Sequence, residues 1–545
     1  MTATPTTTTD FPIPADLEGF WQWDQLHCPR ALTVLEHELL LGSTGWGFSK
    51  AIDELGSGIE AVAKRINGYN YLGGVPLDLG SEDPQARADR YRRNVDALLP
   101  VLGERWEQEW LPGVIETVSR RIRQDYAAMS DADLLRTWDE MFEEVKHRWY
   151  IHGMLLYGFF AAGQFADLYK EVTGADDEKL GYEALQGFET AATRSARGLW
   201  KLSRMVRASP ELRRIFEESK PEELVSQLDT SESGRAFASA FNAYLDEYGW
   251  RADSVYELTH PAWREDPRIA INAIQGYLAI GDDHGPDSQL QSAIRRREEL
   301  VADARARIGN DSASLEKFNA TYETTRYFTP MVEDHNHWID QMGDISMRYP
   351  ALELGRRCAA RGTLANTEDV FHLERADIVE AMQGVDKKDL AAQRKADLER
   401  FAQVVPPPFI GPPPPPSDDP VIDVIVRFFG LPVEPNADPR VINGVAASPG
   451  RVTARAKVVR SLAEASKLQA GDVLVCEMTL PPWTPLFSTA SAVVADTGGI
   501  LSHCAIVARE NRLPCVVGTM RGTSLIKDGQ TITVDGSRGI VRIES

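Results

Sequence analysis

The chain has 545 residues, a net charge of −22, 43% hydrophobic residues and 26% charged residues, the composition of a globular protein with several domains. The strong negative charge argues against a nucleic-acid or anionic-membrane partner. The first ten residues are Thr-rich and lack the basic and apolar regions of a signal peptide, and no apolar run is long enough to span a bilayer. The five cysteines form no CxxC pair, which favours reduced thiols in the cytoplasm and signals no structural metal site.

Helical periodicity dominates residues 1–400, and strand alternation is nearly absent there. Ser130 and Asp131 precede an amphipathic run and indicate a helix N-cap. We therefore expect residues 1–400 to form one large, mainly α-helical body. The helices predicted in it cover residues 31–41, 131–157, 181–207, 288–307 and 313–327.

Prolines mark the next boundary, at residues 401–437. Two runs, at residues 406–408 and 412–416, exclude a helix or a central strand and predict an extended, semi-rigid linker. A short amphipathic helix is expected within the linker at residues 421–429, ended by Gly430.

Residues 438–545 have a different texture. Short β-branched runs alternate with Gly, Pro and Asp turns, and one helix is convincing, at residues 502–511. This segment carries 12 Lys and Arg against 9 Asp and Glu, so the acidic excess of the chain lies elsewhere. The pattern predicts a small β/α domain with a mildly basic balance, which suits a module that handles phosphate.

The segment ADTGGILSHCAIVARENRLPCVVGT, residues 495–519, carries the strongest chemical signal. A strand leads into two glycines, which permit unusual backbone angles and close approach of another group. His503 then falls in the first turn of the helix, where free N–H groups favour an anion. A neutral imidazole is a competent nucleophile, so His503 is placed to accept a phosphoryl group. Taken alone, His503 would more often be an ordinary structural histidine.

The whole pattern resembles the phosphohistidine domain of the phosphoenolpyruvate-utilising and dikinase family, with its GG-x-x-SH-x-A-I-x-A-R-E signature. The resemblance extends over residues 438–545 and implies a swivelling domain in which His503 carries the phosphoryl group between two sites. It departs at residues 495–497, where relatives commonly carry Thr two residues before the glycines and this chain has Asp496 there. The residues that the resemblance implies as support for the phosphohistidine are Thr497, Gly498, Gly499, Ser502 and Arg509.

Relatives of this family differ in the domains that accompany the histidine. The sequence shows no barrel for pyruvate chemistry and no ATP-grasp or glycine-rich phosphate-loop pattern. The expectation is therefore a separate ATP-grasp subunit that binds ATP and Mg²⁺, and an acceptor other than pyruvate.

The helical body resembles the central domain of rifamycin phosphotransferases and of aryl-phosphate synthases that act on phenol, 4-cresol or alkylphenols. The resemblance rests on residues 20–36, 248–251, 261–267, 333–341 and 354–374, and Trp250 stands where many relatives have His. The split arrangement favours the aryl-phosphate synthases. The candidate residues of an acceptor site are Asp24, His27, Arg30, Glu333, His335 and His337.

Several points about these candidates stay open at this stage. His335 and His337 are two residues apart and so do not share a helix face, and their spacing is poor for metal binding. His147 and His152 lie in an aromatic stretch that is more typical of a core than of a pocket. Each candidate histidine can also be purely structural.

The function expected from the sequence is a dikinase-type phosphotransfer. A partner phosphorylates His503 from ATP with release of AMP and phosphate, and His503 delivers the phosphoryl group to a hydroxyl, most simply a phenol. Two alternatives remain, a component of a rifamycin-type antibiotic phosphotransferase and a non-catalytic phosphocarrier or regulatory protein.

Overall fold

The computed structural model describes residues 11–544 except 16, 26, 77–79, 176–178, 220, 229–230, 253–254, 279, 405, 413–423, 425–426, 431–432 and 481–482. It is mainly helical, with a small β/α domain at the C-terminal end of the chain, as the sequence predicts. Contacts divide it into two compact units. Unit 1 comprises Met1–Tyr157, Ser254–His260 and Trp338–Ser417, and unit 2 comprises Gly158–Asp253, Pro261–His337 and Asp418–Ser545. The boundaries expected from the linker, 1–400, 401–437 and 438–545, stay predictions.

Unit 1 contains a four-stranded sheet in the order β2-β3-β1-β4. The strands are β1 (Trp21–Trp23), β2 (Ile59–Ile66), β3 (Tyr69–Pro76) and β4 (Phe409–Ile410). Residues 1–400 are mainly helical as predicted, and this sheet adds strands that their weak alternation did not indicate. Asn67 and Gly68, with φ of 48° and 82°, form the tight turn of the β2–β3 hairpin, and Asn-Gly is a strong hairpin signal. Trp21, Tyr69, Tyr71 and Ile410 bury one face of the sheet.

The first proline run lies on this sheet. Trp23 N donates a hydrogen bond to Pro408 O at 2.9 Å, and the Tyr71 hydroxyl donates to Pro407 O at 2.7 Å. Phe409 and Ile410 then pair with β1 at the sheet edge, where prolines before the strand lose no ladder bond. This half of the expected linker is therefore docked, whereas residues 413–416 of the second proline run lie outside the described residues.

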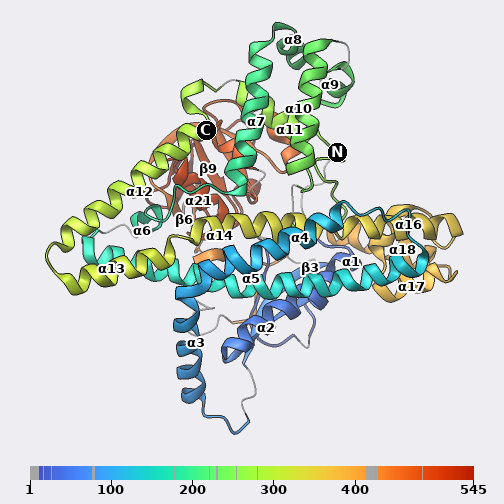
Figure 1. The fold of residues 1–545 in the computed structure, drawn as a ribbon, viewed down its shortest axis with the longest axis horizontal. Coiled ribbons are helices and arrows are strands. Elements are labelled where there is room, and N and C mark those ends of the chain that lie inside the picture. The colour runs from blue at the N-terminus through green and yellow to red at the C-terminus, as the bar shows by residue number, and fades with distance from the viewer. Residues whose placement is uncertain are drawn as a thin grey trace. The chain divides into compact units, whose positions relative to one another are not determined.

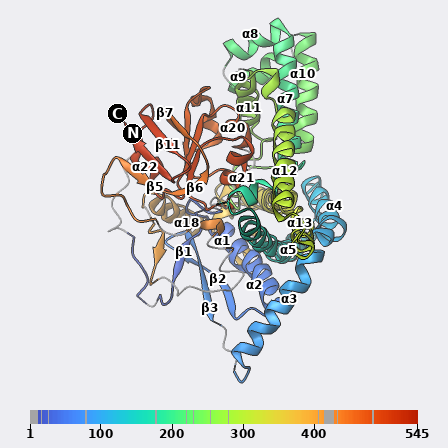
Figure 2. The same ribbon diagram turned by 90° about the vertical axis from the view of Figure 1, so that its left-hand side faces the viewer.

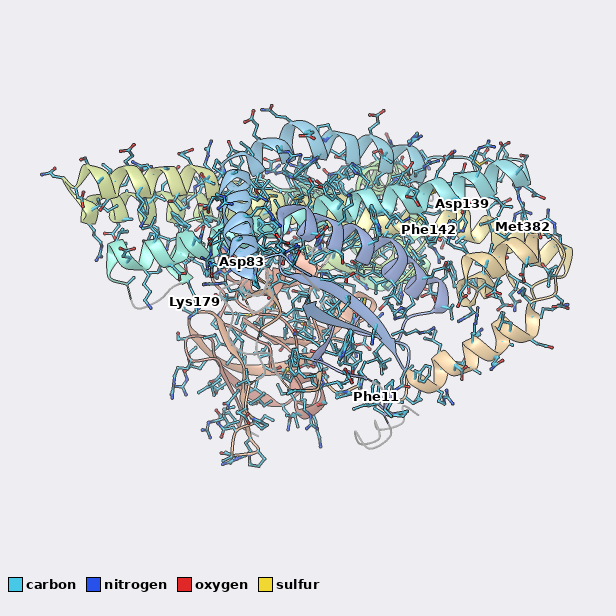
Figure 3. All side chains as sticks on the ribbon, turned by 90° about the horizontal axis from the view of Figure 1, so that it is seen from below. Phe11, Asp83, Asp139, Phe142, Lys179 and Met382 are labelled. Atoms are coloured by element: carbon cyan, nitrogen blue, oxygen red, sulfur yellow. The ribbon has the colours of Figure 1, made fainter. Side chains whose placement is uncertain are left out.

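The remainder of unit 1 is helical, and its elements include long amphipathic helices. Arg375 links two of them, because its guanidinium pairs with Asp139 at 2.5 Å and lies 4.0 Å from the ring centroid of Phe142. Asp139 and Phe142 are labelled in Figure 3. The helices are α1 (Val34–Leu39), α2 (Trp46–Leu55), α3 (Pro84–Arg105), α4 (Leu111–Ile122), the first part of α5 (Asp131–Thr173), α15 (Met342–Ile345), α16 (Arg348–Arg361), α17 (Arg375–Met382) and α18 (Lys388–Phe401).

Caps explain where these helices differ from the sequence prediction. Asp133 N donates to Ser130 Oγ at 3.1 Å, so α5 begins at Asp131 as predicted, but it continues to Thr173. Thr33 caps α1 through a reciprocal capping box with Glu36, so that helix begins at Val34 and continues as a π-helix, Leu40–Gly45. The region 181–207 is not one helix, because Gly187 has φ of 78° and Thr190 caps a new helix at Ala191.

The helical part of unit 2 contains α7 to α11, which lie together in Figures 1 and 2. Arg194 and Ser195 come from α7, Tyr244 and Tyr248 from α10, and Glu333 from α14. The helices are the end of α5, α6 (Lys179–Glu183), α7 (Ala191–Ala208), α8 (Pro210–Glu218), α9 (Pro221–Gln227), α10 (Glu232–Tyr248), α11 (Arg268–Leu278), α12 (Pro286–Ile308), α13 (Ser312–Thr325) and α14 (Phe328–His335). No helix in the described part of the chain is both long enough and apolar enough to cross a membrane.

The C-terminal domain of unit 2 is built on an eight-stranded sheet in the order β5-β12-β11-β7-β8-β9-β10-β6 (Figure 2). The β-branched runs of residues 438–545 form strands, as expected for a small β/α domain. The strands are β5 (Val441–Asn443), β6 (Val445–Ser448), β7 (Arg451–Val458), β8 (Val473–Cys476), β9 (Ala492–Ala495), β10 (Cys515–Val517), β11 (Thr531–Asp535) and β12 (Ile540–Ile543).

Strands β7 to β10 run parallel, and β9 and β10 are joined through α21 (His503–Glu510). The short helices α20 (Thr484–Phe487) and α22 (Gly522–Leu525) complete the domain. Buried Val473, Val494, Val516 and Val534 lie in its apolar core. A β-α-β unit places the start of its helix beyond the carboxyl edge of the sheet, which is where parallel sheets carry their functional groups. His503 is the first residue of α21 and occupies this position.

Candidate functional site

The turn from β9 to α21 positions His503. Gly498 has φ of 100°, and Ser502 is the N-cap of α21. The Ser502 hydroxyl donates to Gly499 O at 2.9 Å and accepts from Ala505 N at 3.5 Å. The turn is therefore closed by its own hydrogen bonds, and the sequence prediction of a helix starting at this point is confirmed.

The imidazole of His503 has two distinct nitrogens in this site. Nδ1 lies 3.2 Å from Glu333 Oε1, so the N–H donates to the carboxylate. Nε2 is buried and has no hydrogen-bond partner in the part of the chain that the structure describes. Glu333 is 5% exposed, and its Oε2 is also buried without a partner among the described residues. The contact fixes the tautomer that leaves the Nε2 lone pair available.

A segment at residues 427–430, here called the strap, lies against the turn. Gly499 N donates to Phe428 O at 2.6 Å, and Leu501 N donates to Arg427 O at 3.1 Å. The Arg427 side chain bonds the Tyr182 hydroxyl at 2.8 Å and lies 3.3 Å from Asp167 Oδ2. Of the helix expected at residues 421–429, Val424 and residues 427–429 are described and helical, and the other residues lie outside the described part.

The strap explains why residue 499 is glycine. A Cβ at this position would lie 2.3 Å from Arg427 O and 2.9 Å from Gly430 N. The sequence predicted that another group approaches the glycine pair closely, and at Gly499 this group is the backbone of the strap.

The other expected support residues make structural contacts. Thr497 Oγ1 donates to Glu477 O at 3.1 Å. Arg509 is buried, and its Nη1 donates to Ala447 O at 3.1 Å and Ile500 O at 2.9 Å. Burial lowers the pKa of Arg509. The contacts of Thr497 and Arg509 hold the β9–α21 turn on the sheet.

Glu510 is the last residue of the family signature, and the sequence alone predicted no role for it. It lies seven residues after His503, two turns along one face of α21. The same face contacts the helical part of the unit at Ile506, whose carbonyl accepts from Gln186 Nε2 at 3.2 Å. Burial and then the neighbouring Glu333 raise the pKa of Glu510 to about 8, and Arg509 partly opposes this. Asp334, next to Glu333, instead accepts from Ala191 N at 2.6 Å and lies 3.6 Å from Arg194.

The expected acceptor residues fall into both units. In unit 2, His335 Nδ1 donates to Met331 O at 3.0 Å, and burial, followed by Arg251 and Arg194, lowers the pKa of His337 well below its usual value. In unit 1, His27 Nδ1 lies 2.9 Å from Asp24 Oδ1, as their spacing suggests. Burial lowers the pKa of His27, but Asp24 and other carboxylates outweigh this and raise it overall.

Arg30 does not continue the Asp24–His27 contact. Its Nη1 donates to Glu257 Oε2 at 2.8 Å and lies 3.0 Å from His260 Nε2, also in unit 1. His152 is the second histidine of the aromatic stretch. Its Nε2 lies 3.7 Å from Asp340 Oδ1, and its ring contacts the Trp149 ring. The role of these residues in an acceptor site stays a prediction.

Comparison with known proteins gives the site its context. Residues 468–539 match the family model of the PEP-utilising enzyme mobile domain. Residues 150–333 match the rifampicin phosphotransferase fourth domain. The first match contains His503, and the second ends at Glu333. The hydrogen bond between His503 and Glu333 therefore joins the two matched regions.

Curated proteins match longer parts of the chain. The chain is 33% identical over 98% of its length to chondramide synthase cmdD of Chondromyces crocatus, covering 14% of that protein. It is 33% identical over 69% of its length to an uncharacterized phosphotransferase, YvkC, of Bacillus subtilis, covering 45% of it. It is 28% identical over 80% of its length to a rifampicin phosphotransferase of Streptomyces sviceus, covering 50% of it.

The chain thus spans half or less of the length of each of these relatives. Two of these relatives are named phosphotransferases.

Gly499→Ala should displace the strap, because the added Cβ cannot coexist with Arg427 O at 2.3 Å. We expect faster hydrogen exchange at the Gly430 segment and at the Leu501 amide, measured by mass spectrometry. Gly276→Ala is the matched control, since its Cβ meets only Thr489 Oγ1 at 3.7 Å. Unchanged exchange in the Gly499 variant would show that the strap does not depend on this approach.

Glu510→Gln should flatten the pH dependence of stability. Since the pKa of Glu510 is higher in the folded state, its contribution is complete below the unfolded value of 4.5 and is lost as the pH rises to about 8. The free energy of unfolding in urea, measured across this range, should fall less steeply in the variant. Glu298→Gln on the exposed face of α12 controls for loss of a charge. Equal slopes in Glu510→Gln and the parent chain would contradict the assignment.

Proposed function

We propose that this chain is the phosphohistidine-bearing and acceptor-binding part of an ATP-dependent phosphotransferase. His503 Nε2 attacks the β-phosphorus of ATP bound with Mg²⁺ on a separate ATP-grasp polypeptide, which releases AMP and leaves a pyrophosphoryl group on the histidine. Water then cleaves this group, which releases phosphate and leaves phosphohistidine. The phosphohistidine then passes its phosphoryl group to a hydroxyl acceptor. The observation that carries the proposal is the contact between His503 Nδ1 and Glu333 Oε1, which leaves a buried Nε2 available at the carboxyl edge of the sheet.

Glu333 acts in this scheme through His503. A carboxylate on Nδ1 fixes the ring and its tautomer, so that Nε2 is the nitrogen that becomes phosphorylated. It also stabilises the positive charge of a ring that carries both the Nδ1 proton and a phosphoryl group on Nε2, which makes the ring a better leaving group. An acceptor in line with the P–Nε2 bond lies on the opposite side of the ring from Nδ1. Glu333 is therefore an orienting residue rather than the base for the acceptor.

The transfer step exchanges one bond for another. The acceptor oxygen forms a bond to phosphorus, the P–Nε2 bond breaks, and its electron pair returns to Nε2. The hydroxyl proton leaves to solvent. Because phosphoryl transfer has a loose transition state, positioning and charge stabilisation are the main tasks of the protein.

The acceptor that we propose is a phenol such as 4-cresol, so that the product is an aryl phosphate. The resemblance of the helical body to aryl-phosphate synthases supports this choice. The relationship to a rifampicin phosphotransferase favours a second candidate, a hydroxyl of a larger antibiotic. If His503 is labelled but transfers to neither class, the chain is a phosphocarrier.

His503→Ala should abolish incorporation of ³²P from β-labelled ATP in the presence of the proposed ATP-grasp partner, because no imidazole remains to form the phosphoramidate. The parent chain should take up acid-labile label and lose it when the acceptor is added. Labelling of the parent chain without the ATP-grasp protein would contradict the separate nucleotide site. Aryl phosphate formation by the His503→Ala variant would contradict the whole scheme.

Glu333→Gln should keep the fold but slow transfer from phosphorylated His503 by about 10²- to 10⁴-fold, the range lost when a histidine loses its orienting carboxylate or proton-transfer partner. A single-turnover chase of labelled chain with acceptor measures this step directly. Asp334→Asn is the neighbouring control, since Asp334 bonds Ala191 N rather than His503. An unchanged chase rate in Glu333→Gln would remove Glu333 from the mechanism.

A further inference from the structure

Arg251 is held rigidly in the helical part of unit 2. It follows α10, is 2% exposed, and its guanidinium carbon lies 4.2 Å from the ring centroid of Trp263. Its Nη2 donates to Ser195 Oγ at 2.6 Å, and Ser195 Oγ lies 2.8 Å from the Tyr244 hydroxyl. Stacking and this hydroxyl chain leave the guanidinium little freedom.

The remaining donors of Arg251 are unused. Nε and Nη1 are buried and have no hydrogen-bond partner among the described residues. Burial lowers the pKa of Arg251, and the groups that oppose this are the hydroxyls of Tyr244 and Tyr248 rather than a carboxylate. A buried charge without a counter-ion costs several kcal/mol in general, so the arrangement is complete only when an anion binds.

Arg204 of the same unit is also stacked on a tryptophan, but its guanidinium donors have hydrogen-bond partners. Its guanidinium stacks on Trp200 at 3.8 Å. Its Nη1 donates to Ile280 O at 3.1 Å and pairs with Asp282 at 2.6 Å, and Nη2 donates to Tyr277 O. Stacking of arginine on tryptophan therefore does not by itself leave donors unused in this protein.

The surroundings of Arg251 favour an oxyanion. Arg251 and the half-exposed Arg194 both act electrostatically on His337, which lies four residues after Glu333 on the same helical path. Positions four residues apart lie about one helical turn from each other, so His337 lies about one turn from Glu333, the residue that contacts His503. A guanidinium presents paired N–H groups that match the oxygens of a phosphoryl group.

We propose that Arg251, with Arg194 beside it, forms an oxyanion site that takes a phosphoryl group, as free phosphate or as the phosphate ester product. The inference rests on the proposed function for its biological role, but the binding itself needs neither ATP nor a partner. The site gives the bound phosphoryl group a fixed positive charge.

Arg251→Met in the full chain tests the site. Inorganic phosphate and phenyl phosphate should each raise the Tm of the parent chain, and the variant should bind both about 10- to 100-fold more weakly, as expected for loss of charged hydrogen bonds. Without ligand, the variant should be as stable as the parent chain or more stable, because it removes an uncompensated buried charge. Titration calorimetry gives the two affinities.

Arg204→Met is the matched control. It removes a stacked arginine with satisfied donors, so it should lower the Tm and leave phosphate binding unchanged. His503→Ala should also retain phosphate binding, which separates failure of this site from failure of the phosphohistidine scheme.

Three results would overturn the inference. They are absence of saturable phosphate binding to the parent chain, equal phosphate affinity in Arg251→Met, and binding of benzoate in place of both phosphates. The first of these does not depend on how any variant folds.

Discussion

The hydrogen bond from His503 Nδ1 to Glu333 Oε1 is the contact around which unit 2 is organised. It requires that the first residue of α21 point away from the C-terminal sheet, which the β9–α21 crossover achieves through two glycines and the Ser502 cap. It also requires that α14 present a carboxylate where water is excluded. In such surroundings a single charged hydrogen bond fixes a tautomer far more strictly than it would in solvent.

Buried charge is handled differently at two arginines of this unit. Arg509 Nη1 donates to two backbone carbonyls and holds the β9–α21 turn, although its Nε has no partner among the described residues. Arg251 Nη2 donates to Ser195, and both its Nε and its Nη1 have no partner in the described part of the chain. Glu333 and Glu510 also differ, since burial and then the neighbouring Glu333 raise the pKa of Glu510 and favour its protonated form beside the acceptor of the His503 proton.

Local signals in the sequence predicted the C-terminal strands, α21 and the position of His503, because each depends on neighbours within a few residues. Glu333 could be proposed only as one of several polar residues, since its contact with His503 spans 170 positions of sequence. The contacts of Arg509 could not be predicted for the same reason, because its partners include a carbonyl of β6 that the sheet brings close, and its role as a support residue stays a prediction. The β2–β3 hairpin could have been predicted from local sequence, because Asn67-Gly68 is a typical hairpin turn. It was missed because apolar and polar residues alternate only weakly in the strands on either side.

The strap constrains how the C-terminal domain can move. Its backbone carbonyls bond Gly499 and Leu501 of that domain, whereas the Arg427 side chain contacts Tyr182 and Asp167 of the helical part. The carboxylate of Asp167 is 60% exposed, and exposed ion pairs contribute about 0–1 kcal/mol. The two backbone bonds, closed by a glycine that admits no side chain, are harder to replace. A swivelling movement would therefore break the Arg427 side-chain contacts first, and the strap would travel with His503.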